Sequence, residues 1–388
     1  MKKQISILGS TGSIGLNVLN IIDKKKNIFK ANVFSANKNY RLICNQIKKY
    51  KPKYFVISNE SVFNKIKKKK IKNKTLIIKN YNEINKKFKS DITVSAIPGL
   101  AGLEPTINLI KSSKKILIAN KESVICGWDL IKKKANKFKT KIIPIDSEHF
   151  SIMQLLKNQN LKMVKKIYIT ASGGPFLDYK VNQLAKIKPK DALKHPKWKM
   201  GKKISVDSST LVNKILELIE AQKIFNIPSN KIDIIIHPES LVHAIVELKN
   251  GLSKFLYHET TMKIPLANAI FDNEIDISNF LINSKYALNN LSFSSVDKKI
   301  FPIIKIKKRL VEFPSTPIII NASNEILVDL FLKKKIPFTG ISRVLLTILN
   351  NRNYRKYAIR KPLNINQINQ IDHWARNKTM QIIKSLYE

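Results

Sequence analysis

Three carboxylates in two short segments are the residues of this sequence best suited to bind a metal ion. Asp146 and Glu148 lie two residues apart after a predicted strand, and Glu217 lies in a stretch with helical spacing. Carboxylate oxygens suit hard divalent cations such as Mg²⁺ and Mn²⁺. Because side chains at i and i+2 share one face of a strand, we expect Asp146 and Glu148 to reach the same ion. A capping Asp and an exposed helix carboxylate are the alternatives, but acids are scarce here, with 27 Asp and Glu against 71 Lys and Arg.

A glycine-rich segment near the start of the chain predicts a nucleotide-binding loop. It reads Gly9-Ser10-Thr11-Gly12-Ser13-Ile14-Gly15, follows a predicted strand at residues 4–9 and precedes a predicted helix at 16–22. Glycines let backbone N–H groups approach a pyrophosphate closely at a helix N-terminus. The spacing is not the common G-x-G-x-x-G form, so the prediction depends on the order strand, loop, helix.

The end of the second predicted strand indicates which dinucleotide binds. An NAD-preferring fold carries an Asp or Glu there, which binds the ribose 2′-hydroxyl. This chain has Asn37-Lys38-Asn39, with Arg41 close behind. The missing carboxylate and the nearby cations favour NADP, which carries a 2′-phosphate. The alternative is that Lys38 is one more surface residue of a lysine-rich chain.

Hydroxyl-rich segments indicate a phosphate site. The segment 206–210 (VDSST) contains residues that cap helix N-termini, and Asn213 and Lys214 follow one turn later. A helix N-terminus lined with hydroxyls also suits phosphate, so capping alone and anion binding are both open. The segment Ser172-Gly173-Gly174 could supply a second lobe for the same anion. Lys121 follows another predicted strand end, where ligands bind in open α/β sheets.

His195 is the histidine best placed to contact a substrate. It lies in a predicted polar loop at residues 189–202 together with Trp198 and Met200. This composition suits a lid that excludes water from a reaction. Three further histidines are expected in the core or as supports of the site, and these are His149, His237 and His243.

The order of apolar segments predicts an α/β chain. Its expected parts are an N-terminal Rossmann-like parallel sheet, a central α+β catalytic domain and a C-terminal helical bundle. Helical stretches rich in lysine separate the first predicted strands, which are residues 4–9, 31–36, 54–58, 75–78, 92–96, 115–119 and 141–145. Later strands are expected at 166–170, 232–236, 241–248 and 253–257, and long helices at 209–225, 321–332, 341–350 and 365–386.

These elements predict three domains and a linker. We expect a nucleotide-binding domain at residues 1–147, a catalytic domain with the metal site and the lid at 148–271, a linker at 272–299 and a helical domain at 300–388. No apolar run reaches about 18 residues, so no transmembrane helix is expected. The first residues are interpreted as a strand and not as a signal peptide. Cys44 and Cys126 are expected to be reduced, buried thiols of a cytoplasmic protein.

The net charge of +44 has two interpretations. A basic face could bind nucleic acid by releasing counterions. The excess is nearly all Lys, however, and the lysines occur all along the chain, mostly between apolar positions of predicted helices. Arg, which binds phosphate in a fork, is scarce, and aromatic residues do not alternate with the basic runs. We therefore favour a solvated lysine-rich surface with no specific nucleic-acid partner and no membrane partner, although it should attract anionic substrates.

Seven motifs occur in the order found in one enzyme family. They are GSTGSIG, ANKES, DSEH, SGGPF, HPxWxMGxKISVDSxTxxNKxLExIEA, HPxSxxH and NASNEI. Together they closely resemble the 1-deoxy-D-xylulose 5-phosphate reductoisomerases of the non-mevalonate isoprenoid pathway. The resemblance extends from the first residue to about residue 332, and the motif that begins at His195 is the most specific part.

The resemblance implies an NADPH-dependent enzyme that also requires Mg²⁺, Mn²⁺ or Co²⁺ and forms a homodimer. Such an enzyme rearranges 1-deoxy-D-xylulose 5-phosphate and reduces the product to 2-C-methyl-D-erythritol 4-phosphate. The implied metal ligands are Asp146, Glu148 and Glu217. The implied substrate contacts are Lys121, Ser147, Glu148, Ser172, His195, Ser208, Asn213, Lys214 and Glu217, with Trp198 and Met200 as the lid. The implied NADPH contacts are Thr11, Gly12, Ser13, Ile14, Asn37, Lys38, Asn39, Asn120, Glu122 and Gly201.

Departures from the family pattern accompany these matches. Asn37 stands where the family usually has Gly, and residues 258–263 (HETTMK) replace a usual P-D-M-R run. None of the implied ligands lies in the second segment. Two alternatives to a reductoisomerase are a plain NADP-dependent dehydrogenase and a catalytically inactive polyanion-binding protein. The first does not need three carboxylates, and the intact carboxylates argue against the second.

Overall fold

The computed structural model describes residues 2–69, 74–85, 87–198, 200–278 and 291–387. The chain folds into two compact units. Unit 1 comprises Met1–Ser123, Gly127–Phe150 and Met262–Lys285, and unit 2 comprises Val124–Cys126, Ser151–Thr261 and Tyr286–Glu388. In the described part of the chain, no helix is both long enough and apolar enough to cross a membrane.

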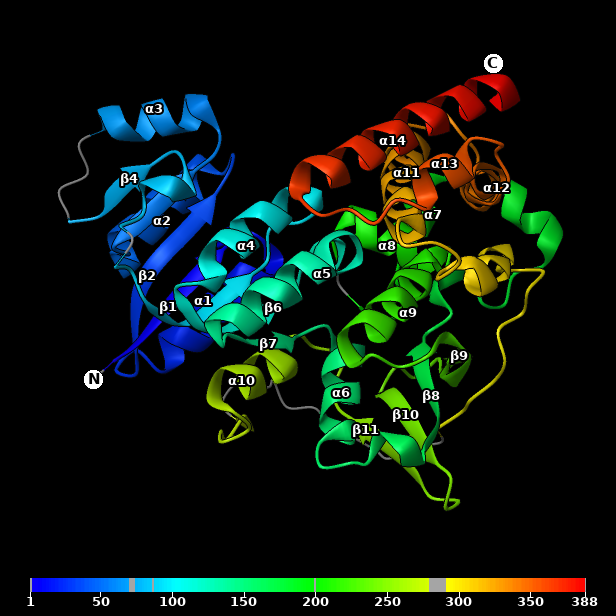
Figure 1. Cartoon of the computed structure of the whole chain (residues 1–388), viewed down its shortest axis with the longest axis horizontal. Coiled ribbons are helices and arrows are strands. Elements are labelled where there is room, and N and C mark those ends of the chain that lie inside the picture. Colours follow the sequence, from blue (N-terminus) through cyan, green and yellow to red (C-terminus); the bar gives the residue numbers. More distant parts are fainter. Residues whose placement is uncertain (1, 70–73, 86, 199, 279–290, 388) are drawn as a thin grey trace. The chain divides into compact units, whose positions relative to one another are not determined.

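Unit 1 contains a seven-stranded sheet in which every described pair of strands is parallel (Figure 1). Its strand order is β4-β3-β2-β1-β5-β6-β7, so the direction of winding reverses between β1 and β5. The carboxyl ends of parallel strands meet at one edge, and ligands bind where the winding reverses. The strands are β1 (Lys3–Leu8), β2 (Phe29–Ala36), β3 (Tyr54–Ile57), β4 (Leu76–Ile78), β5 (Ser90–Ser95), β6 (Ser113–Ile118) and β7 (Lys141–Pro144).

Helices connect these strands and bury their apolar faces. In α1 (Ser13–Lys24), Val18, Ile21 and Ile22 are buried at helical spacing, and the helix contacts α10 (Lys263–Phe271). The other helices are α2 (Tyr40–Tyr50), α3 (Glu60–Lys68), α4 (Leu103–Ile110), α5 (Lys121–Phe138) and α6 (Ser147–Leu156). The lysine-rich stretches between strands are therefore amphipathic helices, as their periodicity predicts.

Unit 2 begins with a four-stranded sheet of order β11-β10-β8-β9. Strand β10 (Val242–Leu248) is antiparallel to β8 (Val164–Ala171) and to β11 (Ser253–Tyr257), whereas β8 is parallel to β9 (Ile232–Ile236). This mixed sheet and its helices form the α+β part that the sequence predicts. The predicted polar loop at residues 189–202 is partly wrong, because a short helix, α7 (Pro189–Ala192), begins it with a proline at its first position.

Helices form the rest of unit 2, as Figure 1 shows in yellow, orange and red. A 3₁₀ segment (Pro302–Arg309) precedes α11 (Thr316–Leu332), α12 (Phe338–Leu349), α13 (Tyr354–Ala358) and α14 (Ile365–Tyr387). α11 is buried along most of its length, and Arg376 of α14 forms ion pairs with Asp372 and with Glu325 of α11. Residues 279–290 of the expected linker lie outside the described residues, and Ser294 pairs with Ile236 at the end of β9.

The predicted α/β fold class is confirmed. The helix expected at residues 209–225 is present as α9 (Val212–Phe225), and a separate helix that was not expected, α8 (Lys202–Ser209), precedes it. Leu211 separates them in the left-handed region with a φ of 59°, a conformation that costs energy for a residue with a side chain. Residues 206–209 therefore end α8 and do not cap the N-terminus of a helix.

Candidate active site

The glycine loop of unit 1 occupies the end of β1, beside the point where the winding reverses. Gly9 has a φ of +83°, and a Cβ there would lie 2.6 Å from the carbonyl oxygen of Ala96. A Cβ on Gly15 would lie 2.5 Å from the carbonyl oxygen of Gly9. Only glycine fits both positions, and Gly12 is the N-cap of α1. The loop therefore presents backbone N–H groups at a helix N-terminus, which suits a pyrophosphate.

A buried Ser–Gln pair holds this loop, and the sequence analysis missed it. The Ser10 hydroxyl donates to Oε1 of Gln46 at 2.6 Å, and Nε2 of Gln46 donates to the Ser10 carbonyl at 2.9 Å. Both residues are at least 95% buried. Gln46 lies on the face of α2 that also buries Ile43 and Ile47. A Gln at an apolar position of an amphipathic helix was the available signal.

The turn after β2 carries the residues expected to distinguish NADP from NAD. Asn37, Lys38 and Asn39 are exposed, and the turn contains no carboxylate. Asn39 is the N-cap of α2, and its side chain accepts a hydrogen bond from the backbone N–H of Leu42 at 3.1 Å. The side chain of Asn39 therefore also has a local structural role.

Asn120 joins two loops at the ends of β5 and β6. Its side chain accepts the N–H of Ser123 and so caps α5, and its amide donates to the carbonyl oxygens of Ile97 and of Gly99, the latter at 2.9 Å. It is 3% exposed. Lys121 is the first residue of α5, so this cap fixes the start of the helix that carries its ammonium group.

The acidic pair lies at the start of a helix and not on a strand, so the expected geometry is wrong. Strand β7 ends at Pro144, Asp146 precedes α6, and Glu148 lies in the first turn of α6. This turn still brings one carboxylate oxygen of Asp146 and one of Glu148 within 4.8 Å of each other. Asp146 contacts Lys121 Nζ at 2.9 Å and His149 Nδ1 at 3.4 Å. Two carboxylates at this separation fit a hard divalent cation.

Glu217 of unit 2 is a buried carboxylate within a polar group on α9. It is 1% exposed, which excludes the alternative of a surface helix acid. Asn213 donates to Oε1 of Glu217, and Lys214 Nζ lies 2.8 Å from Oε2. Asn213 and Lys214 are in the first turn of α9, one helical turn before Glu217, as their spacing predicts.

The two hydroxyl-bearing segments expected to bind one phosphate lie against each other in unit 2. A Cβ on Gly174 would lie 3.2 Å from Cα of Ser209 and 3.3 Å from the carbonyl oxygen of Ser208. Gly174 has a φ of +66°, so glycine is favoured there for two independent reasons. Asp207 does not serve as an N-cap, because it is buried between Lys203 at 2.9 Å and Asn324 of α11 at 2.7 Å.

His195 is neutral, and its tautomer follows from its contacts. The backbone N–H groups of Lys197 and Trp198 donate to Nδ1 at 3.1 and 2.9 Å. The proton of the neutral ring therefore lies on Nε2, which faces the hydroxyl oxygen of Ser172 at 3.1 Å. Burial, with the nearby charge of Lys214, lowers the pKa of His195 to about 4. At pH 7 His195 is thus a hydrogen-bond donor without charge.

Trp198, which is expected to be part of a lid, contacts a stacked pair of histidines. Its ring meets His243 edge-on at 6.1 Å between centroids, and His243 stacks on His258 at 3.8 Å. Burial, with the neighbouring His243, lowers the pKa of His258 to about 3. His258 belongs to the segment that departs from the family pattern, so the aromatic surface behind Trp198 is partly particular to this chain. Met200 is half-buried, and Lys199 lies outside the described residues.

The remaining histidines have supporting positions. His149 is fully buried beside Asp146, and His237 accepts the N–H groups of Leu241 and Val242 at 3.2 and 3.1 Å through Nε2. The other ring nitrogen of His237 bonds the carbonyl of Ser292 at 2.9 Å. His237 therefore organises the turn between β9 and β10, which is the supporting role expected from the sequence.

A parallel nucleotide-binding sheet with a glycine loop, together with carboxylates suited to a divalent cation, is typical of a metal-assisted, dinucleotide-dependent oxidoreductase. Three family models match the chain. They describe 1-deoxy-D-xylulose 5-phosphate reductoisomerase at residues 5–127, its C-terminal domain at 142–225 and the DXP reductoisomerase C-terminal domain at 258–378. The chain belongs to the 1-deoxy-D-xylulose 5-phosphate reductoisomerase family.

Individual relatives match nearly the full length. The 1-deoxy-D-xylulose 5-phosphate reductoisomerase of Pelagibacter ubique is 44% identical over 97% of this chain and 98% of its own. That of a Wolbachia from Drosophila simulans is 42% identical over 88% of this chain and 89% of its own. A crystal structure of DOX-P reductoisomerase with NADPH, fosmidomycin and magnesium has a TM-score of 0.91 and 31% identity, covering 99% of both chains. The Zymomonas mobilis enzyme in complex with NADPH has a TM-score of 0.87 and 29% identity over the whole of both chains.

Proposed function

We propose that the protein converts 1-deoxy-D-xylulose 5-phosphate to 2-C-methyl-D-erythritol 4-phosphate in isoprenoid precursor synthesis. The full-length match to one enzyme family carries this conclusion. The reaction depends on NADPH and on a divalent cation, as the complexes of structural relatives with NADPH and magnesium support. The remaining proposals assign roles to the residues of this chain.

Asp146, Glu148 and Glu217 are the proposed metal ligands. The proximity of the first two carboxylates and the burial of the third support this assignment. A divalent cation held by carboxylates acts as a Lewis acid that polarises a carbonyl oxygen of the substrate. Lys121, which contacts Asp146, orients that carboxylate and presents its own charge beside it.

The substrate phosphate is proposed to bind in unit 2. Ser172, Ser208, Asn213 and Lys214 provide hydroxyl, amide and ammonium donors on adjoining segments. Phosphate binding at a distance from the reacting carbons supplies energy that positions them. His195 donates a hydrogen bond from Nε2 to a substrate oxygen and, being neutral, does not compete with Lys214 for anionic charge.

The other proposed contacts surround the hydroxyl-bearing carbons and exclude water. Ser147 provides a hydroxyl donor beside Glu148. Trp198 and Met200 are proposed to cover the bound substrate, which limits the loss of reactive fragments. The His243 ring supports Trp198 from behind.

NADPH is proposed to bind along the carboxyl edge of the parallel sheet. The glycine loop provides backbone donors for the pyrophosphate, and the turn after β2 provides Lys38 for the 2′-phosphate. Asn120 holds the loops at the ends of β5 and β6 in place. The proposed contacts are Thr11, Gly12, Ser13, Ile14, Asn37, Lys38, Asn39, Asn120, Glu122 and Gly201.

The domain roles follow from these assignments. Residues 1–147 are proposed to bind NADPH, and residues 148–271 to carry the metal site and the lid. Residues 272–299 are proposed to be a linker that leads to a helical domain at 300–388. We also propose a cytoplasmic location, which agrees with the unbridged, buried Cys44 and Cys126.

We propose that the protein is a homodimer that associates through β11. This strand is at the edge of its sheet, and Phe255 and the adjoining Leu252 are 55% and 61% exposed. An apolar edge strand is suited to pairing with another chain. Sedimentation equilibrium should give twice the chain mass for the protein and the single chain mass for Phe255→Lys. A wild-type protein that sediments as a monomer would contradict the dimer.

The function is tested by following NADPH oxidation by the purified protein with 1-deoxy-D-xylulose 5-phosphate. Oxidation should require Mn²⁺ or Mg²⁺ and should stop when EDTA is added. NADH should react more slowly, and Lys38→Ala should weaken NADPH binding more than NADH binding. Turnover that persists in EDTA would indicate a plain dehydrogenase, and equal losses for both dinucleotides would exclude Lys38 as the 2′-phosphate ligand.

A further inference from the structure

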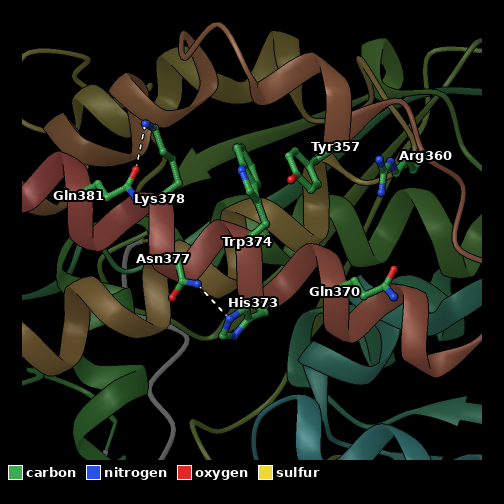
Figure 2. A pocket seen from close by; sticks show the side chains of 8 residues that line it. All are labelled: Tyr357, Arg360, Gln370, His373, Trp374, Asn377, Lys378 and Gln381. Carbon is green, nitrogen blue, oxygen red and sulfur yellow. Dashed lines mark hydrogen bonds between the residues drawn. The ribbon is translucent and has the colours of Figure 1, made fainter.

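The C-terminal helices carry a hollow of about 540 Å³ that the proposed reaction does not use. Tyr357 of α13 and the following Arg360 form one side, and α14 contributes Trp374 and Lys378 (Figure 2). The volume lies within the range of about 300–1,000 Å³ that small-molecule sites occupy.

A row of planar groups lines this hollow. The rings of Tyr357 and Trp374 are stacked, with centroids 4.3 Å apart and planes inclined by 13°. The guanidinium carbon of Arg360 lies 5.0 Å from the centroid of Tyr357. Figure 2 shows Tyr357 between Trp374 and Arg360. Both aromatic rings are only half-buried, so part of their surface faces solvent.

The charge of the hollow is positive. None of the described residues that line it is Asp or Glu. The Lys378 ammonium donates to the neutral amide oxygen of Gln381 at 3.1 Å. In the described part of the chain, neither Arg360 nor Lys378 forms an ion pair with a carboxylate. Both charges are therefore available to an anion, with the amides of Gln370 and Asn377 as further polar partners.

A second hollow adjoins the first, and the two together are called the groove below. The second hollow measures about 340 Å³ and shares Arg360 and Gln370 with the first. It adds Lys361 and the exposed side chain of Leu363. The lining residues of α14 run from Gln367 to Gln381, which corresponds to about 21 Å along the helix axis. This length accommodates more than one nucleotide.

We propose that this groove binds single-stranded nucleic acid without reading its base sequence. A base stacks at the Trp374 end of this row, and phosphates contact Arg360 and Lys378, which is the combination found in single-strand binding sites. An acidic peptide would satisfy the cations but would leave the aromatic row without a matching partner. Tyr357 and Arg360 lie in and just after α13, whereas Trp374 and Lys378 lie in α14, so only the packing of the two segments brings the four side chains into one hollow. The net charge of +44 raises the local concentration of polyanions.

The test measures the binding of a fluorescent eight-nucleotide oligouridylate to the full-length protein by anisotropy, at fixed salt. NADPH is present throughout, so that the glycine loop is occupied. Trp374→Leu should weaken binding about fivefold or more, because each stacked base contributes that much or more. Arg360→Gln, at an exposed position, should weaken it as well. Lys384→Gln removes one charge from an exposed position of α14 outside both hollows and should change binding by less than about twofold.

Turnover of the sugar phosphate should be unchanged in all three variants. Weaker binding of UMP with the same response to Trp374→Leu supports the groove, and equally tight UMP binding would overturn the proposal, because a free nucleotide would then be the occupant. Three further results would overturn it. They are equal losses for Arg360→Gln and Lys384→Gln, equal affinity for an abasic octamer, and displacement of the oligouridylate by oligoglutamate at matched charge.

Discussion

At the scale of single residues, buried polar side chains determine the properties of the site. Glu217 is a carboxylate with almost no exposed surface, and its neighbours Asn213 and Lys214 bind its two oxygens. A buried carboxylate requires such partners because removal from water is expensive. Burial also determines the state of His195, but here it keeps the ring neutral, because a buried charge would be unfavourable.

Glu217→Gln should reduce turnover by about 100-fold or more, because a neutral amide is a weaker ligand for a hard cation than a carboxylate. The Mn²⁺ concentration that gives half of the maximal rate should rise. NADPH affinity should stay within about twofold, since the nucleotide contacts lie elsewhere. Glu220→Gln is the matched control, because Glu220 is equally buried on the same helix. Full activity of Glu217→Gln, or an equal rise in the Mn²⁺ requirement of both variants, would contradict the metal assignment.

The buried ring of His258 should make stability depend on pH. The pKa of His258 is about 3 in the folded protein, against 6.5 for an ordinary His, so between these values the unfolded chain binds more protons. Stability should therefore fall as the pH drops below 6.5, and His195 contributes in the same direction. His258→Asn should reduce the loss between pH 7 and pH 5 by about 2 kcal/mol.

Urea unfolding at the two pH values measures this effect. The control is His373→Asn, at an exposed position of α14, which should lose as much stability between pH 7 and pH 5 as the wild type. An unchanged loss in His258→Asn would show that His258 does not contribute to the pH dependence.

At the scale of elements, the beginnings and ends of helices position the proposed ligands. The start of α6 brings Asp146 and Glu148 together, and the cap of α5 fixes Lys121. The break at Leu211 starts a new helix, α9, whose first turn carries Asn213 and Lys214. In each case a short backbone feature places a charged side chain.

Asn120→Ala should destabilise the protein by about 2 kcal/mol or more. The substitution removes an N-cap, worth about 1 kcal/mol, and also leaves the half-buried carbonyls of Ile97 and Gly99 without their donor. Asn39→Ala removes only the exposed cap of α2 and should cost about 1 kcal/mol. The free energies of unfolding in urea compare the two. Equal losses would mean that the bonds from Asn120 to the neighbouring loop add no stability.

At the scale of the whole molecule, the net charge of +44 must be held on one folded chain. Like charges repel one another and oppose compaction, and salt screens this repulsion. Increasing KCl from about 0.01 M to about 0.5 M should raise the melting temperature by about 2 °C or more, the shift that corresponds to roughly 2 kcal/mol in a chain of 388 residues. The melting temperature in sucrose at equal osmolality is the control, because sucrose is excluded from the protein surface but does not screen charge. No rise in KCl would mean that the lysines are already far enough apart to repel little.

Much of the fold could be predicted from the sequence because the signals are local. The order of strands and helices follows from apolar periodicity, and the loop from Gly9 to Gly15 follows from glycine spacing. The identity of the candidate ligands follows from residue chemistry, since few side chains suit a hard cation in a chain poor in acids. These inferences require only neighbouring residues.

Contacts between distant residues were decided only by the tertiary structure. The sequence placed Asp146 and Glu148 on one strand face, but the chain turns into a helix between them and brings their oxygens together another way. Segment 206–210 contains residue types that cap helices, but Asp207 of this segment is buried and accepts a hydrogen bond from Asn324 of α11. The charge state of His195 depends on burial and on Lys214. Burial, pairing and protonation are set by residues that packing brings close, and no local spacing encodes them.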